Sequence, residues 1–324
     1  MSLHTLPDEI LLDIWNGLDS PHSMNAFIRS CRRFHRIFNG SLYRYASNTP
    51  RGLAAAMDWV GQHGRVDALR RFIDELGAAD VIHDPASTPL FAAAEYGQDA
   101  LVRFLIQQGI DLDLQRRDHY TEFLAIGVAA KHRRESTVRL LFEAGADIEG
   151  REDFRSALLA ATENGHDEIV KFLVAQGARQ VSDDGDQNAL CCALKENCSI
   201  EVIRLLLNEN QPTDLLDRLG EYDLTPLGLA AEEGNIEGNI EAAQLLLAAG
   251  ADVDAGFQFT PLKAAIGKRQ EAMARFLILE AGACVGQPGI HSVALEKATR
   301  MGLHDIVQLL VEHGADPTAT EISE

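Results

Sequence analysis

Residues 88–109 read TPLFAAAEYGQDALVRFLIQQG and predict two short helices separated by a turn. The Thr88 hydroxyl can cap the first helix, and Pro89 suits a helix start because its missing N–H would have no partner there. Gly97 ends this helix, an apolar stripe at helical spacing predicts the second, and Gly109 supplies a left-handed stop. Neither helix could bury its apolar face alone, so the pair requires neighbours of the same kind.

The same pattern returns along most of the chain, which makes it an architecture rather than a local feature. Positions equivalent to Thr88 are Ala55, Thr88, Leu124, Ser156, Asn188, Thr225, Thr260 and Val293, at intervals of 33, 36, 32, 32, 37, 35 and 33 residues. Eight units therefore follow one another. A chain of this kind is expected to stack its helix pairs in a row rather than to fold around one central core.

The openings and endings of these units resemble the ankyrin repeat, whose period is about 33 residues and whose first helix opens with Thr-Pro-Leu. Thr-Pro-Leu begins at Thr88, Thr225 and Thr260, and Gly-Ala-Asp closes units at 145–147, 250–252 and 314–316. The resemblance implies an all-α ankyrin-repeat solenoid with short hairpin loops. We expect a helical module at 1–48, the repeat array at 49–319 and a frayed tail at 320–324.

Three units depart from the pattern in ways that could change the geometry of the array. The fifth lacks a closing Gly-Ala and continues through a long connection from Asn208 to Asp223, which predicts a break in the superhelix. The sixth repeats Gly-Asn-Ile-Glu at 234–237 and 238–241, and four extra residues amount to one helical turn, so we expect a bulge between its two helices. In the seventh, Arg269 stands where glycine normally separates the helices.

The composition limits the partners and the compartment. Of 324 residues, 29 are Lys or Arg and 49 are Asp or Glu, a net charge of −20. Such a charge repels nucleic acid and anionic membranes and favours a basic protein, a basic peptide or a cationic small molecule, although it can also simply keep a long array soluble. Five cysteines without metal-binding spacing indicate no metal site and a reducing compartment. With no apolar run near the roughly 20 residues of a membrane span, we expect a cytoplasmic or nuclear protein.

The first 48 residues have a different pattern, with two apolar stripes at helical spacing. The segments LPDEILLDIWNGL and MNAFIRSCRRFHRIF resemble an F-box. The matching features are Leu6, Pro7, Glu9, Ile10, Leu11, Cys31, Arg32 and Phe34. This family binds the Skp adaptor of a cullin–RING ubiquitin ligase, so the resemblance implies a substrate receptor.

Docking on the adaptor would use one apolar helix face laid in a groove. By position in the family's pattern, its residues are Leu6, Pro7, Ile10, Leu11 and Ile14. The alternative is that this module only covers the exposed end of the solenoid, which a terminal repeat also requires.

In ankyrin families, partners contact the loop tips before each helix pair and the two positions just before the internal glycine. Exposed aromatic rings beside acidic side chains make suitable interface anchors, although some of these rings could pack inward. The positions selected in this way are Glu95, Tyr96, Tyr120, Phe123, Lys131, His132, Glu163, Asn164, Lys195, Glu196, Tyr222, Glu232, Glu233, Phe257 and Phe259.

Three functions agree with these observations. The first is a substrate receptor, with the F-box-like module on a Skp-type adaptor and the repeats on a protein destined for ubiquitination. The second is a scaffold that binds a partner without a ligase. The third is an enzyme that binds a cationic, guanidinium-bearing substrate through Glu95, His132, Glu163 and Glu196. No catalytic or cofactor-binding motif occurs in the sequence, so we expect a receptor with no cofactor.

Overall fold

The computed structural model describes residues 50–76, 82–83, 88–114, 116–117, 122–149, 156–181, 188–207, 216–217, 224–232, 236–256, 259–285 and 292–316. The predicted module at 1–48 and the tail at 320–324 lie outside these residues. The chain divides into two compact units, residues 1–150 and residues 151–324, which are described separately.

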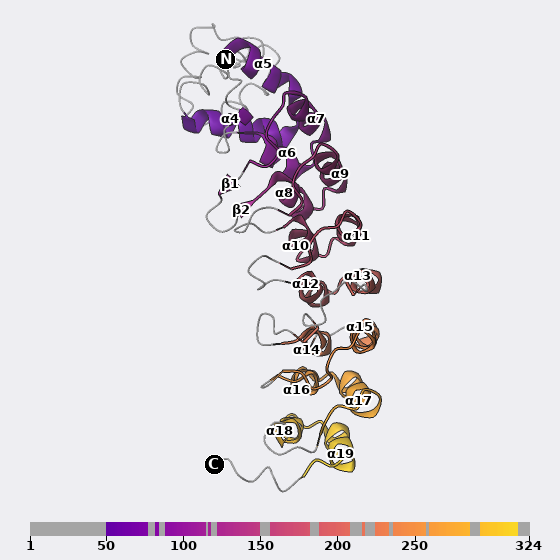
Figure 1. Ribbon diagram of the computed structural model, residues 1–324. Helices are drawn as coiled ribbons and strands as arrows, with labels where there is room; N and C mark the ends of the chain where they lie inside the picture. The colour runs from indigo at the N-terminus through magenta and orange to yellow at the C-terminus, as the bar shows by residue number, and fades with distance from the viewer. Residues whose placement is uncertain are drawn as a thin grey trace, which may run out of the picture. The chain divides into compact units, whose positions relative to one another are not determined.

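The described residues of the first unit form three helix pairs and a short hairpin (Figure 1). Its elements are α4 (Pro50–His63), α5 (Val66–Leu76), α6 (Leu90–Tyr96), α7 (Asp99–Gln107), β1 (Arg116–Arg117), β2 (Glu122–Phe123), α8 (Ala125–Lys131) and α9 (Glu135–Glu143). Each first helix packs on the next first helix, and α7 packs in the same way on both α5 and α9. The hairpin pairs Arg116 with Phe123 through the backbone, which accounts for the long interval before Leu124.

In the second unit, the described residues form five helix pairs, in which the first and second helices form two parallel rows (Figure 1). Its elements are α10 (Ala157–Thr162), α11 (Asp167–Ala175), α12 (Ala189–Lys195), α13 (Ile200–Leu206), α14 (Pro226–Glu232), α15 (Ile236–Ala248), α16 (Pro261–Gly267), α17 (Glu271–Leu279), α18 (Ser292–Arg300) and α19 (His304–Glu312). The described residues thus hold eight helix pairs, as the eight repeated positions predict.

The repeat beginning at Thr88 confirms the local expectations except one: α6 begins at Leu90, so Pro89 directly precedes the helix instead of opening it. The Thr88 hydroxyl accepts a hydrogen bond from the Leu90 N–H (3.3 Å), and Gly97 ends α6 in the left-handed region at φ 71°. The second helix buries Leu101, Val102 and Leu105 completely. Full burial of a leucine side chain stabilises the fold by about 1.5–3 kcal/mol, so the stacked repeats and not the isolated helices provide the stability.

Two predicted irregularities are wrong. The break expected after the fifth repeat does not occur, because α12 packs on α14 and α13 on α15 across that connection. The bulge expected in the sixth repeat is instead an extra helical turn, since α15 has 13 residues where the other second helices of this unit have seven or nine. One whole turn preserves the buried face, so Ala242, Ala243 and Leu246 stay in the core.

In two of the repeats, an arginine occupies the left-handed position between the two helices, where most other repeats have glycine. Arg133 has φ 59° and Arg269 has φ 60°, a conformation that is costly for any residue with a Cβ. The Arg269 guanidinium donates to the carbonyl oxygen of Met301 in the next repeat (3.0 Å). The side chain therefore gives the array a contact that glycine could not make.

Aspartates in the closing turns connect one repeat to the next. The N–H of Asp147 donates to a carboxylate oxygen of Asp113 (2.9 Å), and that of Asp252 donates to Asp217 (2.8 Å). The Cys284 N–H lies within reach of both oxygens of Asp254, at 3.0 and 3.2 Å. A charged acceptor strengthens such bonds, so part of the acidity of this chain is structural.

Candidate functional site

The ends of the first helices carry most of the positions predicted to contact a partner. In the first unit, Glu95 and Tyr96 end α6, Lys131 ends α8, and His132 follows it. Tyr96 is 41% exposed. The Glu95 carbonyl oxygen accepts from Nε of Arg134 (2.8 Å), so the backbone at this position also connects two repeats.

Tyr96 lines a pocket of about 550 Å³ with arginine side chains. Arg133, Arg134 and Arg139 all contribute to it. Arg139 is paired with Glu135 at 2.8 Å, and Arg134 is held by the Glu95 carbonyl, so two of these guanidinium groups already have partners within the fold. Part of the polar lining of this pocket is therefore already used in contacts within the fold.

In the second unit, the predicted positions follow the first helices in the same way. Glu163 and Asn164 come directly after α10, and the Asn164 amide donates back to the Ala160 carbonyl oxygen (2.8 Å). Lys195 ends α12 and is exposed, as is Glu196 directly after it. Glu232 ends α14 and forms an ion pair with Lys268 at 2.7 Å.

A groove of about 530 Å³ runs over the first helices of the last four repeats, and we call it the lysine groove. It is lined by Lys195, Leu224, Leu229, Glu232, Phe259, Ala264, Gly267, Lys268 and Lys297. Phe259 is 42% exposed, whereas Leu224 and Leu229 are buried. The lysine groove thus combines an exposed ring, an apolar floor, three ammonium groups and one carboxylate.

Lys297 connects the lysine groove to a fourth lysine. Its ammonium group donates to the carbonyl oxygen of Lys263 (3.3 Å) and lies so near Gly267 that a Cβ at that position would clash with it. Lys263 is only 5% exposed, and burial, with a smaller contribution from Lys297, lowers the pKa of its ammonium group. The ammonium groups of Lys297 and Lys263 are therefore close enough for the charge of Lys297 to act on Lys263.

The structure does not gather the four residues of the enzymatic hypothesis in one unit. Glu95 and His132 belong to the first unit, and Glu163 and Glu196 belong to the second. Among the described residues, no group of three or more His, Cys, Asp or Glu side chains could hold a metal ion. Burial raises the pKa of Cys191 to about 12, so this thiol remains protonated at neutral pH.

Several predicted residues lie outside the described part of the chain, or only their backbone lies within it. Outside it are Leu6, Pro7, Ile10, Leu11, Ile14, Tyr120, Tyr222, Glu233 and Phe257. Phe123 is placed only as a backbone partner in β2. Adaptor docking and these loop-tip contacts therefore stay predictions.

Sequence reasoning missed Lys297, which lies four residues after the repeat marker Val293. At the same place in three other repeats the side chain is a buried alanine: Ala92, Ala160 and Ala264. The sequence does hold a signal for this residue, namely a lysine at a position where three other repeats have alanine. Lys297 lies neither at a loop tip nor at the two positions before the internal glycine, which are the places where the ankyrin pattern predicts partner contacts.

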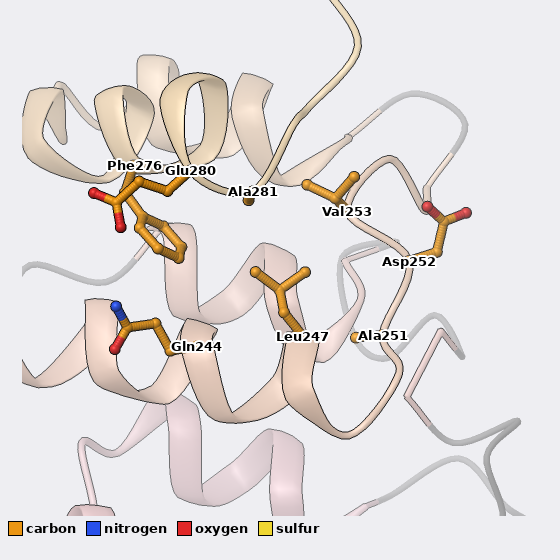
Figure 2. A pocket seen from close by; sticks show the side chains of 8 residues that line it. All are labelled: Gln244, Leu247, Ala251, Asp252, Val253, Phe276, Glu280 and Ala281. Carbon is orange, nitrogen blue, oxygen red and sulfur yellow. The ribbon is translucent and has the colours of Figure 1, made fainter.

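A second pocket of the same unit lies between α15 and α17 and has a volume of about 630 Å³. Figure 2 shows the Phe276 ring of α17 and the Leu247 side chain of α15 pointing into the space between the two helices. Gln244 and Glu280 lie on the same side of this pocket as the ring. This pocket belongs to the row of second helices, whereas the lysine groove belongs to the row of first helices.

Comparisons with known proteins agree on the fold. The family model described as "Ankyrin repeats (3 copies)" matches residues 53–152, 126–215, 158–255, 200–289 and 237–321. The crystal structure of the human ASB11 ankyrin repeat domain superposes with a TM-score of 0.53 at 18% identity, covering 81% of this chain and 98% of that one.

Two relatives show how such repeats occur within larger proteins. The ankyrin repeat and KH domain-containing protein mask-1 of Caenorhabditis elegans is 29% identical over 63% of this chain and 7% of its own length. The E3 ubiquitin-protein ligase KEG of Arabidopsis thaliana is 27% identical over 82% of this chain and 18% of its own length. The chain thus spans less than a fifth of either relative. None of the helices in the described part of the chain has the length and apolar character needed to cross a membrane.

Proposed function

Because the chain belongs to the ankyrin-repeat family, whose repeats bind protein partners, we propose that it is a receptor that holds a partner protein along its row of first helices. The observation that carries this proposal is the lysine groove, where an exposed Phe259 lies beside charged side chains over an apolar floor. Aromatic rings flanked by polar groups are the usual anchors of protein interfaces.

The finer form of the proposal is a substrate receptor of a cullin–RING ubiquitin ligase. It rests on the F-box-like Leu6-Pro7-x-Glu9-Ile10-Leu11 segment ahead of the repeats. A relative named an E3 ubiquitin-protein ligase is in keeping with ankyrin repeats serving in ubiquitination. In this proposal, residues 1–48 dock on a Skp-type adaptor and the repeats select the protein to be modified.

Calorimetry with a purified Skp-type adaptor tests the finer proposal. The full chain is expected to bind with micromolar or tighter affinity, and the double variant Leu6→Ala/Pro7→Ala is expected to lose that binding. A matched double variant, Ser2→Ala/Ser23→Ala, changes residues outside the family's pattern and should bind as the unchanged chain does. Undiminished binding by Leu6→Ala/Pro7→Ala would refute adaptor docking and leave the scaffold alternative.

A further inference from the structure

We propose that a pocket of the first unit, which we call the arginine pocket, binds a phosphoryl group carried by a side chain of the partner protein. The arginine pocket is the one of about 550 Å³ lined by Tyr96, Gly97, Arg133, Arg134, Glu135, Ser136 and Arg139. The inference rests on the proposed partner-binding function and names a group that the partner carries.

Arg133 takes a backbone conformation for which the fold does not need an arginine. Its φ of 59° is costly for a residue with a Cβ, and Gly97 takes the same position in the preceding repeat. Arg269 has a similar φ, but its guanidinium donates to the next repeat. The Arg133 side chain forms no hydrogen bond or ion pair in the part of the chain that the structure describes. An unfavourable conformation without a compensating contact points to a role in binding.

Arg134 carries a charge that its structural contact does not require. Its Nε donates to the Glu95 carbonyl oxygen (2.8 Å). In the preceding repeat, Gln98 stands at the equivalent position, and its side-chain amide donates to the Gln62 carbonyl oxygen (2.8 Å). An uncharged amide is therefore sufficient to connect two repeats here. Because the acceptor is a neutral carbonyl, the positive charge of Arg134 stays uncompensated.

The carboxylates around the arginine pocket do not neutralise these two guanidinium groups. Glu135 is paired with Arg139 at 2.8 Å. Asp99 accepts a hydrogen bond from the Thr137 hydroxyl (2.6 Å). Glu95 contributes its carbonyl oxygen, and among the described residues its carboxylate forms no ion pair with either arginine.

The net charge of the first unit also opposes an anionic ligand less than that of the second. Residues 1–150 contain 16 Lys and Arg against 20 Asp and Glu, a net charge of −4. Residues 151–324 contain 13 against 29, a net charge of −16. The basic partner that the overall charge favours is therefore an expectation for the second unit, and the first unit can hold an anionic group.

The rest of the lining suits a phosphorylated side chain. A guanidinium can pair with phosphate through two parallel hydrogen bonds. A phosphorylated side chain carries a charge of about −1.5 to −2 and three acceptor oxygens, which matches two unpaired arginines. Ser136 adds a hydroxyl donor, and Tyr96, which is 41% exposed, adds an aromatic face. The volume falls within the range of small-ligand sites, so the ring of a phosphotyrosine can enter and pack against Tyr96.

The test uses the labelled peptide Ala-Ser-Gly-Tyr-Gly-Ser-Ala, with its tyrosine phosphorylated or not, and fluorescence anisotropy on the full chain in 50 mM salt. The phosphorylated peptide is expected to bind at least tenfold more tightly than the other, since two exposed charge pairs contribute up to about fivefold each. Equal binding of the two peptides, or no binding of either, would overturn the proposal.

Two variants assign the binding to the arginines. Arg133→Gly should weaken phosphopeptide binding about fivefold and raise the thermal midpoint, because glycine takes a φ of 59° without strain. Arg134→Gln should also weaken binding about fivefold and keep the fold, because Gln98 makes the equivalent contact between repeats. A lower thermal midpoint of Arg133→Gly would show that Arg133 has a structural role and would overturn the strain argument on which the proposal depends.

The matched control is Arg65→Gln, which removes the same charge from the same unit. Arg65 directly precedes α5, is exposed and does not line the arginine pocket. Its substitution should leave phosphopeptide binding within twofold. A loss equal to that of Arg133→Gly would show that only the overall field matters and would overturn the proposal.

Other carriers of phosphate provide the last comparison. Tighter binding of a single-stranded oligonucleotide, or of vesicles containing a phosphoinositide, than of the phosphopeptide would overturn the assignment to a protein partner. The adaptor experiment depends on Leu6 and Pro7, and this one depends on Arg133 and Arg134. A chain that binds the adaptor but not the phosphopeptide would refute only this inference, and the reverse result would refute only the ligase proposal.

Discussion

Removal of the Asp254 carboxylate should destabilise the second unit by about 1.5–2 kcal/mol. The Cys284 N–H donates toward both of its oxygens, at 3.0 and 3.2 Å, in a half-buried position. Hydrogen bonds to charged groups stabilise proteins by about 1.5–3 kcal/mol. One donor serves both oxygens and the site is partly hydrated, so the lower part of that range applies to Asp254→Ala. Asp254→Asn keeps one oxygen acceptor and should lose about half as much.

Urea unfolding at pH 7, followed by far-ultraviolet circular dichroism, measures the loss. Because repeat arrays unfold with coupling mainly between neighbours, hydrogen exchange in α16 and α17 should locate it. Glu280→Ala removes the same charge from an exposed position and should stay within about 0.5 kcal/mol of the unchanged protein. The reasoning is refuted if Asp254→Ala matches that control, or if Asp254→Asn is as unstable as Asp254→Ala, because charge rather than the acceptor would then be responsible.

Two other changes probe the core of the second unit. Lys263→Met should raise the thermal midpoint at pH 7, because burial and Lys297 lower the pKa of Lys263 in the folded state, so its charge opposes folding below that pKa. In the unchanged protein this destabilisation disappears as the pH rises toward 10.5, the pKa of lysine in the unfolded chain. The difference in thermal midpoint between the two proteins should therefore narrow from pH 7 to pH 10. A constant difference would contradict a lowered pKa of Lys263. Deletion of 238–241 should cost less than about 1 kcal/mol, because one whole turn is removed and Ala242 keeps its register. Deletion of 238–239 alone rotates the helix by about 200° and should unfold the repeat; equal stability of the two deletions would disprove the register argument.

The repeat pattern could be predicted because its determinants are local. Thr88 bonds its own helix, and Gly97 and Gly109 adopt the left-handed conformation their positions require. The place of the four extra residues of α15 could not be predicted, because their number fits a bulge or an added helical turn equally, and packing of Ala242 and Leu246 decides between the two.

The candidate site could be predicted only in part, because it depends on which side chains of different repeats meet. Counting residues placed Lys195 and Phe259 among the partner contacts, and both line the lysine groove. It also selected Glu232 as a partner contact, but that carboxylate is paired with Lys268 within the fold. The two paired residues are 36 positions apart in the sequence, so no local sequence pattern predicts their contact.

The arginine at the left-handed position of the seventh repeat affects how sharply the array unfolds. In a linear array, stability divides into what each repeat contributes alone and what each junction adds. Arg269 weakens the first term by about 1–2 kcal/mol through its backbone conformation at φ 60°, and it strengthens the second through its bond to Met301. Glycine at this position would raise the intrinsic stability of the seventh repeat and weaken its interface with the eighth repeat. The end of the array would then fray before the rest and the unfolding transition would broaden, so the cooperativity of the array depends in part on a residue that is locally unfavourable.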